Sequence, residues 1–183
     1  MIHGLVLAAG AGSRMGTPKA LVRDEYGEPW VARAVGVLRD GGCREVTVVL
    51  GAAAEAALEL VPDGAGVVVA RDWEVGMSAS LKAGLVAAAA TDATAALIHL
   101  VDLPDVTADV VRRVLAHDDD PGGLARATYE GRPGHPVLVG RDHWSPMAAG
   151  MAGDEGARVY LAAHDAVAVE CGDLATGDDV DRR

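Results

Sequence analysis

Phenylalanine is absent from this 183-residue chain, and aromatic side chains make up only 3% of it. Half of the residues are nevertheless apolar, so valine, leucine and alanine must build the core. A chain of this length is large enough for one sizeable core and suits one domain. We therefore expect residues 1–183 to form a single domain.

Positive charge and cysteine are also scarce. The net charge of -11 argues against a nucleic-acid backbone or an anionic membrane as the main partner. Cys43 and Cys171 are too few for a disulfide framework and fit no metal-ligand spacing, so we expect both to be reduced and structural. No basic segment opens the chain, so we expect no signal peptide. We therefore expect a cytoplasmic location. The apolar stretch 83–101 is interrupted by polar residues at 91–94, which favours a helix, a turn and a strand over a membrane span.

Lysine is the rarest basic residue, with only Lys19 and Lys82 beside 14 arginines. Both lysines lie in loop-like, glycine-containing surroundings. A lysine ammonium is a compact point charge that suits a phosphate oxygen. The two lysines are therefore candidate phosphate ligands, with a chance surface position as the alternative.

Apolar runs rich in valine alternate with segments of helical spacing along the whole chain. Continuous apolar runs are typical of strands that are buried on both faces. The pattern predicts an α/β domain with a mainly parallel sheet covered by helices on both faces. The expected strands are residues 2–8, 45–50, 66–70, 95–101, 123–128, 136–139 and 166–170, and the expected helices are residues 30–39, 52–61, 78–90, 108–117 and 157–164.

A glycine-rich loop follows the first expected strand. It contains Gly10, Gly12 and Gly16, with Arg14 inside it and Lys19 just beyond it. Glycines let backbone N–H groups approach an anion, and basic side chains neutralise that anion. Because ligands of parallel sheets bind at the carboxyl ends of the strands, this loop predicts a nucleotide site.

Acidic residues follow the fourth expected strand. Asp102 is released from a buried strand and is fixed by the nearby Pro104. Carboxylate oxygens are the ligands that Mg²⁺ prefers, so Asp102 is a candidate metal ligand, with a turn cap as the alternative. Asp105 or Thr107 is expected to cap the next helix. Asp181 belongs to an acidic segment that, taken alone, reads as a solvated tail.

Two further loops carry polar groups. Gly76 permits a tight turn, after which Ser78 and Ser80 can cap a helix whose N-terminus faces an anion or a base edge. His135 lies between two prolines, where it can contact an acceptor substrate or brace the turn.

Two mechanisms compete for the glycine loop. The spacing of Gly10, Gly12 and Gly16 resembles a variant of the dinucleotide-binding fingerprint, which implies an NADP-dependent oxidoreductase. That motif expects a polar selector after the second strand, where this chain has only small apolar residues at 51–54. Nucleotidyl transfer needs donors and cations for a triphosphate, a bridging Mg²⁺ and a positioned acceptor. The loop with Lys19, Lys82 and Asp102 supplies these parts, which favours a triphosphate.

Five motifs in one order resemble the molybdopterin nucleotidyltransferase-like family of NTP transferases. They are LAAGAGSRMG at 7–16 followed by Lys19, the segment 73–85, VDLP at 101–104, GHPVL at 134–138 and GDEGAR at 153–158. The resemblance spans nearly the whole chain and is strongest to the CTP:molybdenum-cofactor cytidylyltransferases. It implies a three-layer Rossmann-like nucleotidyltransferase fold and a Mg²⁺-dependent transfer of CMP from CTP to a molybdopterin-type cofactor, with release of pyrophosphate.

The resemblance also implies a role for each site residue. The substrates would be CTP, which the Ala-Ala-Gly form of the loop favours over GTP, and a small phosphorylated acceptor. The implied assignments are base contacts from Ala8, Ala9 and Gly10, triphosphate contacts from Arg14 and Lys19, base or ribose contacts from Gly76 and Ser80, Mg²⁺ ligands in Asp102 and Asp181, and an acceptor pocket lined by His135 and residues 153–158. The glycine loop adds Gly12 and Ser13 as candidate nucleotide contacts, and the rarity of lysine adds Lys82.

The sequence departs from the family pattern at two places. Arg71 and Asp72 stand where an Asn is common in the family. After the final motif at Asp181 this sequence has Arg182 and Arg183, where the family usually has Thr-Pro and a helix. Related sequences include nicotine-blue oxidoreductases, so an NADP- or flavin-linked reductase and a catalytically idle nucleotide-binding module are the alternatives.

Overall fold

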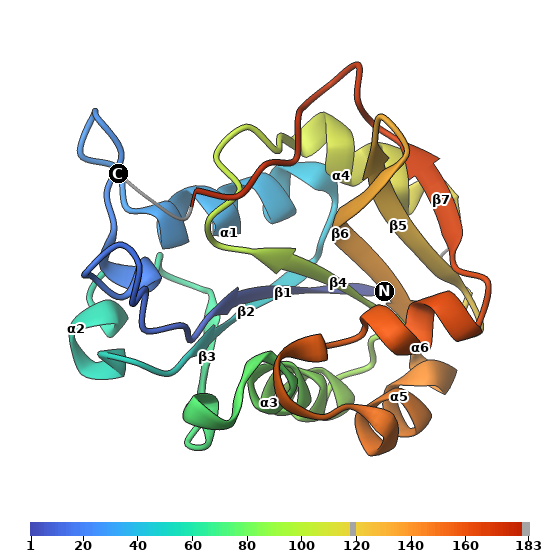
Figure 1. Ribbon diagram of the computed structural model, residues 1–183, viewed down its shortest axis with the longest axis horizontal. Helices are drawn as coiled ribbons and strands as arrows, with labels where there is room; N and C mark the ends of the chain where they lie inside the picture. Colours follow the sequence, from blue (N-terminus) through green and yellow to red (C-terminus); the bar gives the residue numbers. More distant parts are fainter. Residues whose placement is uncertain (118–119, 181–183) are drawn as a thin grey trace.

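The apolar runs form a seven-stranded sheet in the computed structural model, which describes residues 1–117 and 120–180 (Figure 1). Among these residues the strands lie side by side in the order β3-β2-β1-β4-β6-β5-β7. Their bounds are β1 Ile2–Ala8, β2 Glu45–Leu50, β3 Gly66–Val69, β4 Ala95–Leu100, β5 Leu124–Tyr129, β6 Arg132–Gly140 and β7 Val167–Glu170.

The sheet is mainly parallel, as the continuous apolar runs predict. Strand β1 pairs in parallel with β2 and β4, β2 pairs in parallel with β3, and β5 pairs in parallel with β7. Strand β6 runs antiparallel to both of its neighbours. The pairing of β1 with β4 places the loops after these two strands at the same edge of the sheet.

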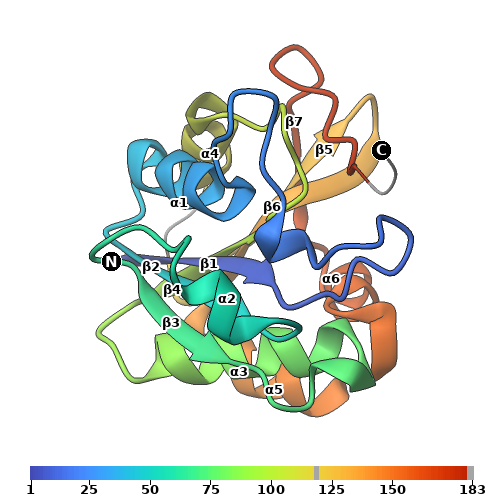
Figure 2. The ribbon, with the colours of Figure 1, turned by 90° about the vertical axis from the view of Figure 1, so that its left-hand side faces the viewer.

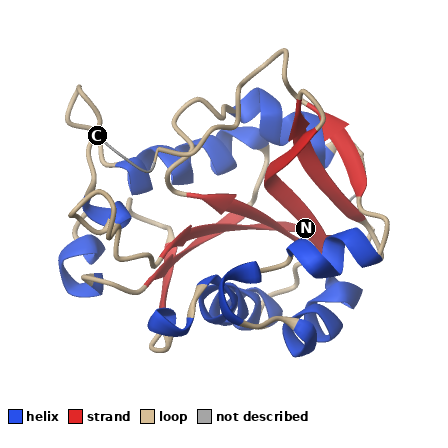
Figure 3. Cartoon of the chain, in the orientation of Figure 1, coloured by secondary structure: helices blue, strands red, loops and turns tan. Residues whose placement is uncertain are grey.

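Helices cover both faces of the sheet (Figures 1 and 3). Helices α1 and α4 lie on one face, and α3, α5 and α6 lie on the other. The short α2 faces the viewer in Figure 2 and contacts η1, the turn after the glycine loop. The bounds are α1 Trp30–Gly41, α2 Ala54–Leu58, α3 Met77–Ala89, α4 Ala108–Leu115, α5 Trp144–Gly150 and α6 Arg158–Ala163, with single 3₁₀ turns at η1 Lys19–Leu21, η2 Trp73–Val75, η3 Arg141–His143 and η4 Gly153–Glu155.

Alternate side chains of each strand enter two separate apolar layers. On β1, Val6 packs with the α1 and α4 side, whereas Leu5 and Leu7 pack with the α3 side. Both layers are built mostly from valine, leucine and alanine, as the composition predicts. Cys43 and Cys171 are buried free thiols, and burial raises the pKa of Cys43 to about 12.

Two predicted elements differ clearly from the structure, and one helix of the structure was not predicted. The helix expected at 52–61 is only Ala54–Leu58, because the next residues form i→i+3 turns. The strand expected at 136–139 begins already at Arg132, since it pairs with β5 through its proline-containing start. Helix α5 was not predicted, because its short sequence contains Pro146 and has weak helical propensity. Tertiary packing stabilises it: Met147 is fully buried and the Trp144 indole N–H donates to the Val139 carbonyl at 2.9 Å.

The stretch 83–101 forms the end of α3, a turn and β4, as predicted. Within the described ranges, no helix has both the length and the apolarity needed to cross a membrane.

The segment after β7 runs back along the α1 and α4 side toward the loop after β4 (Figure 1). The Thr176 backbone N–H and hydroxyl donate to Asp105 Oδ2 at 2.6 and 2.7 Å. The Val180 N–H donates to the Asp102 carbonyl at 3.0 Å. Thr107, not Asp105, is the residue before α4, so Asp105 anchors the C-terminal segment instead of capping the helix. The described part of this segment is therefore fixed to the site loop and is not a free tail.

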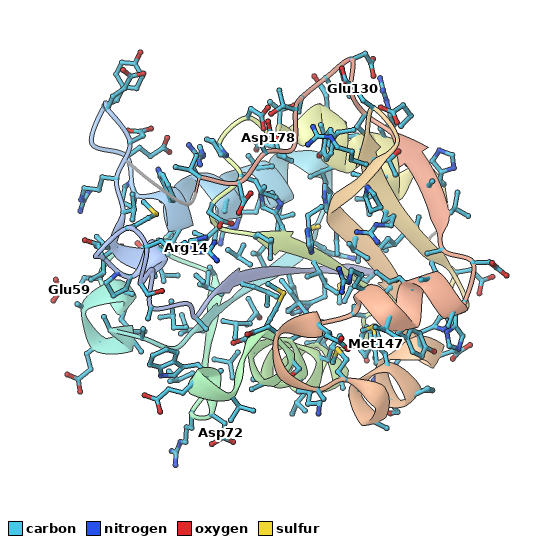
Figure 4. The ribbon with its side chains drawn as sticks, viewed as in Figure 1. Arg14, Glu59, Asp72, Glu130, Met147 and Asp178 are labelled. Atoms are coloured by element: carbon cyan, nitrogen blue, oxygen red, sulfur yellow. The ribbon has the colours of Figure 1, made fainter. Side chains whose placement is uncertain are left out.

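Glu170 holds the turn between β5 and β6 from the end of β7. Its carboxylate accepts hydrogen bonds from the backbone N–H groups of Glu130 and Gly131 and from the Thr128 hydroxyl. These bonds, chiefly the one from Glu130, act together with a hydrogen bond from the Gly172 backbone N–H, and they lower the pKa of Glu170 from 4.5 to about 2. Figure 4 labels Glu130 at the tip of the hairpin.

We expect Glu170→Gln to lower stability at neutral pH and to flatten its acid dependence. A folded-state pKa below the unfolded value means that the ionised carboxylate stabilises the fold above about pH 4.5, and that this contribution is lost as pH falls toward about 2. Thermal unfolding from pH 7 to pH 2 should show the two curves converging at the acid end. Glu59→Gln, at an exposed position labelled in Figure 4, is the matched control. A constant difference between Glu170→Gln and wild type at every pH would contradict this account.

Candidate functional site

The candidate site lies at the carboxyl ends of β1 and β4. Leu7 of β1 faces Leu100 of β4, and the Val101 N–H donates to the Leu7 carbonyl at 3.2 Å, so the two strands stay paired up to their loops. A cavity of about 340 Å³ opens there. Its lining includes seven of the predicted residues, namely Ala8, Ala9, Gly10, Lys19, Gly76, Ser80 and Asp102.

Lys19 and Asp102 form an ion pair across this cavity. Lys19 begins the turn η1 after the glycine loop, and its Nζ contacts Asp102 Oδ2. The side chains are only 20% and 8% exposed, so the pair is largely removed from solvent. In such surroundings each charge depends on the other, because an unpaired buried charge is costly. Two candidates from separate motifs, 83 positions apart in the sequence, are thus brought into direct contact.

The glycine loop forms a second, adjoining cavity of about 260 Å³. It is lined by Gly12, Ser13 and Arg14 and shares Gly10 and Lys19 with the first cavity. Gly12 has φ +59°, and a Cβ there would lie 1.9 Å from the Thr17 carbonyl oxygen, so only glycine fits. A Cβ at Gly10 would meet no protein atom within 4 Å, which leaves that backbone open toward the cavity. Figure 4 shows Arg14 in the loop that follows β1.

Gly76 lets another loop pack onto the start of α3. Its φ is +125°, and a Cβ there would lie 2.5 Å from Asp154 Oδ1 and 2.6 Å from the Gly153 carbonyl carbon. The Met77 N–H donates to Asp154 Oδ1 at 3.4 Å. Ser80, which is buried, follows on the first turn of α3 and lines the cavity. Gly76 therefore lines the cavity, and its lack of a side chain allows η4 to pack closely against it.

Lys82 does not reach this cavity. Its Nζ donates to the Met151 carbonyl at 3.0 Å, and the residue lines a shallow depression on the outer side of α3. Ser80 and Lys82 are two positions apart on one helix, and such residues do not share a face. The interpretation of Lys82 as a phosphate ligand overlooked this geometry. Its ammonium instead fixes α3 to the end of α5.

A third cavity, of about 410 Å³, adjoins the first one. Arg126 of β5 lies in its wall, together with His135, Asp154, Glu155, Ala157 and Arg158. Burial lowers the pKa of His135 to about 4, and the charge of Arg126 adds to this effect, so the imidazole is neutral at pH 7. Arg126 was not predicted from the sequence, although a charged residue inside an apolar strand is a usable signal. The sequence also did not indicate that Trp73 and Glu74 line the first cavity, or that Asp154 lines it as well as the third cavity.

Asp181, the predicted second metal ligand, lies outside the described residues. In the described parts of the chain, no three histidine, cysteine or acidic side chains gather as a metal site. Asp102, Glu74 and Asp154 are the carboxylates in the wall of the first cavity. Oxygen donors of this kind suit Mg²⁺, and the contact of Asp102 with the Lys19 ammonium shows that this carboxylate takes a cationic partner there.

Comparison with known proteins identifies the family of this chain. Residues 4–167 match the MobA-like NTP transferase domain. The chain belongs to the MobA-like NTP transferase family. The nicotine blue oxidoreductase of Paenarthrobacter nicotinovorans is 37% identical to this MobA-like chain, over 98% of it and 92% of the relative.

Solved structures agree with the MobA-like assignment and with the predicted fold. The Mycobacterium tuberculosis Rv0371c homolog from Mycobacterium sp. strain JC1 superposes with a TM-score of 0.81 at 29% identity, covering 99% of this chain and 90% of that one. Rv0371c of Mycobacterium tuberculosis H37Rv, solved as a complex with manganese, superposes with a TM-score of 0.72 at 27% identity, covering 93% of this chain and 86% of that one. This MobA-like chain thus has an α/β nucleotidyltransferase fold with a largely parallel sheet.

We expect Gly76→Ala to destabilise the MobA-like fold by about 1–3 kcal/mol, because the added methyl group meets η4 and the backbone has a left-handed φ. Gly150→Ala is the matched control, since a Cβ there meets nothing within 4 Å. Urea unfolding of both variants measures the difference. Equal free energies of unfolding for the two variants would show that the approach of η4 to Gly76 is not close in solution.

Proposed function

We propose that this protein is a Mg²⁺-dependent nucleotidyltransferase that transfers CMP from CTP to a molybdopterin-type acceptor and releases pyrophosphate. The observation that carries this proposal is the arrangement of the three cavities. The first cavity, with Lys19 and Asp102, adjoins the glycine loop on one side. On the other side it shares Leu7, Met77 and Asp154 with the third cavity. Two substrates can therefore meet in the first cavity, whose wall includes the ion pair.

The nucleotide is proposed to occupy the first two cavities. Ala8, Ala9 and Gly10 offer backbone groups to the base, and Gly76 and Ser80 lie at the other wall, where the ribose fits. Gly12, Ser13 and Arg14 line the loop cavity, which suits the triphosphate because backbone N–H groups and a guanidinium both favour phosphate oxygens. The Ala-Ala-Gly start of the loop favours cytosine through the family resemblance.

Asp102 and Asp181 are the proposed Mg²⁺ ligands. The bound ion supplies charge neutralisation for the phosphates. The manganese complex of Rv0371c is a precedent for a divalent metal in a family fold. Lys19 contacts Asp102 in the protein alone, and we propose that its ammonium turns to the leaving pyrophosphate when nucleotide and metal bind.

The proposed reaction needs no covalent enzyme intermediate. A phosphate oxygen of the acceptor attacks the α-phosphorus of CTP, and the bond from that phosphorus to the oxygen bridging to the β-phosphate breaks. The electron pair of that bond leaves with pyrophosphate. The attacking oxygen is already anionic, so no side chain must remove a proton from it. Catalysis then rests on positioning and on charge neutralisation by Arg14 and Lys19.

A reductase is the competing function, because the relative with 37% identity is named a nicotine blue oxidoreductase. Thermal unfolding with CTP, GTP or NADPH, each with and without Mg²⁺, separates the candidates. The proposal expects stabilisation by CTP that requires Mg²⁺ and exceeds that by GTP. Stabilisation by NADPH without metal would favour the reductase instead. Release of pyrophosphate with CTP and molybdopterin distinguishes an active transferase from an idle nucleotide-binding module.

Asp102→Asn should abolish transfer, with a loss of roughly 100-fold or more in kcat, because it keeps the side-chain shape but removes the metal-binding charge. Pyrophosphate release measures this loss, and thermal unfolding checks that the variant is folded. Asp142→Asn, an exposed position on η3, is the control and should retain wild-type activity. Near-normal turnover of Asp102→Asn with Mg²⁺ would remove the carboxylate from the mechanism.

A further inference from the structure

Arg126 is a cation with unused hydrogen-bonding capacity inside the protein. It lies on β5 between the buried Ala125 and Ala127. Its Nη2 donates to the Gly134 carbonyl at 3.3 Å. Its Nε is buried and has no hydrogen-bond partner among the described residues. A buried donor left unsatisfied costs free energy, so such a group signals a partner that binds from outside.

The third cavity is the space into which this guanidinium opens. Arg126 and His135 form the polar part of its wall on the sheet side, and Leu81, Ile98 and Leu161 supply apolar surface. His135 is neutral at pH 7, so the positive charge on the sheet side comes from Arg126. A guanidinium carries donors and no acceptor. A ligand that satisfies it must therefore present an accepting atom beside an apolar body.

The position of Arg126 relative to the nucleotide site defines which end of the ligand it meets. The first and third cavities share Leu7, Met77 and Asp154. Arg126 lines neither of the two cavities assigned to the nucleotide. An acceptor that reacts at the shared wall therefore has its opposite end at Arg126.

We propose that Arg126 selects the acceptor by donating from its guanidinium to a ring carbonyl or carboxylate oxygen at the end opposite the attacking phosphate. This inference rests on the proposed function, because it takes the acceptor to be the occupant of the third cavity. The substrate class is a planar ring system with an oxygen acceptor at one end and a phosphate at the other. The cavity volume of about 410 Å³ lies in the range of small-molecule sites.

Three probes test the Arg126 contact without requiring turnover. Fluorescence titration of the full chain with 2-naphthoate, 2-naphthamide and naphthalene compares a carboxylate, a neutral carbonyl and a ring without oxygen. We expect Arg126→Met to weaken binding of at least one oxygenated probe by about tenfold or more, since a charged donor is lost. Naphthalene binding should stay unchanged, and the probe that loses more identifies the oxygen. Equal weakening of all three probes, or no weakening of either oxygenated probe, would overturn the proposal.

Arg158 provides the matched control, because it lines the same cavity but is exposed. Arg158→Met should weaken the oxygenated probes less than Arg126→Met, and an equal or larger effect would contradict the proposal. Arg126→Gln keeps an amide donor and should recover part of the loss. If Arg126→Met fails to fold, Arg126→Gln carries the same comparison against wild type.

Kinetics separate this inference from the proposed function. With CTP, Mg²⁺ and molybdopterin, Arg126→Met should raise the KM for the acceptor and leave the KM for CTP unchanged. If the wild type releases no pyrophosphate, the proposed transfer fails, and the probe titrations still decide the role of Arg126. If the wild type turns over and the acceptor KM of the variant is unchanged, the Arg126 proposal fails alone.

Discussion

The ion pair between Lys19 and Asp102 is the contact on which the arrangement of the site depends. It joins the glycine loop after β1 to the loop after β4, and the β1–β4 ladder brings these loops together before any ligand is present. The low exposure of both side chains makes the pair sensitive to any new charge nearby. An anion can compete for the ammonium and a cation can compete for the carboxylate. The same two groups can therefore receive both charges of a metal–triphosphate complex.

Much of the fold was predictable because its central strands are buried on both faces. Such strands must be apolar along their whole length, so Ile2–Ala8 and Glu45–Leu50 match their predicted bounds. Helix α5 was not predictable in this way. Its residues have weak helical propensity, and burial of Trp144 and Met147 stabilises it through contacts with distant parts of the chain.

The candidate site was predictable where the chain order alone decides proximity. Residues that follow β1 and β4 meet because parallel neighbouring strands end at one edge, which is the case for Gly10 and Asp102. Lys82 lies outside the first cavity, a position that the sequence could not indicate because the rarity of a residue type says nothing about the face of a helix on which it lies. The role of Asp105 depends on a tertiary contact to Thr176 that no local pattern encodes. For Arg126, the charge within an apolar strand marks the residue as unusual, but the cavity that it lines is set by tertiary packing.

The wall shared by the first and third cavities has a consequence for the release of a product formed there. Joining two bound molecules converts two separate ligands into one that keeps the contacts of both. A tethered ligand gains from the high effective concentration of its second half once the first half is bound. A condensation product formed across Leu7, Met77 and Asp154 would therefore leave more slowly than either starting molecule. Turnover would then be limited by dissociation, and a downstream protein that takes the product directly would accelerate the cycle.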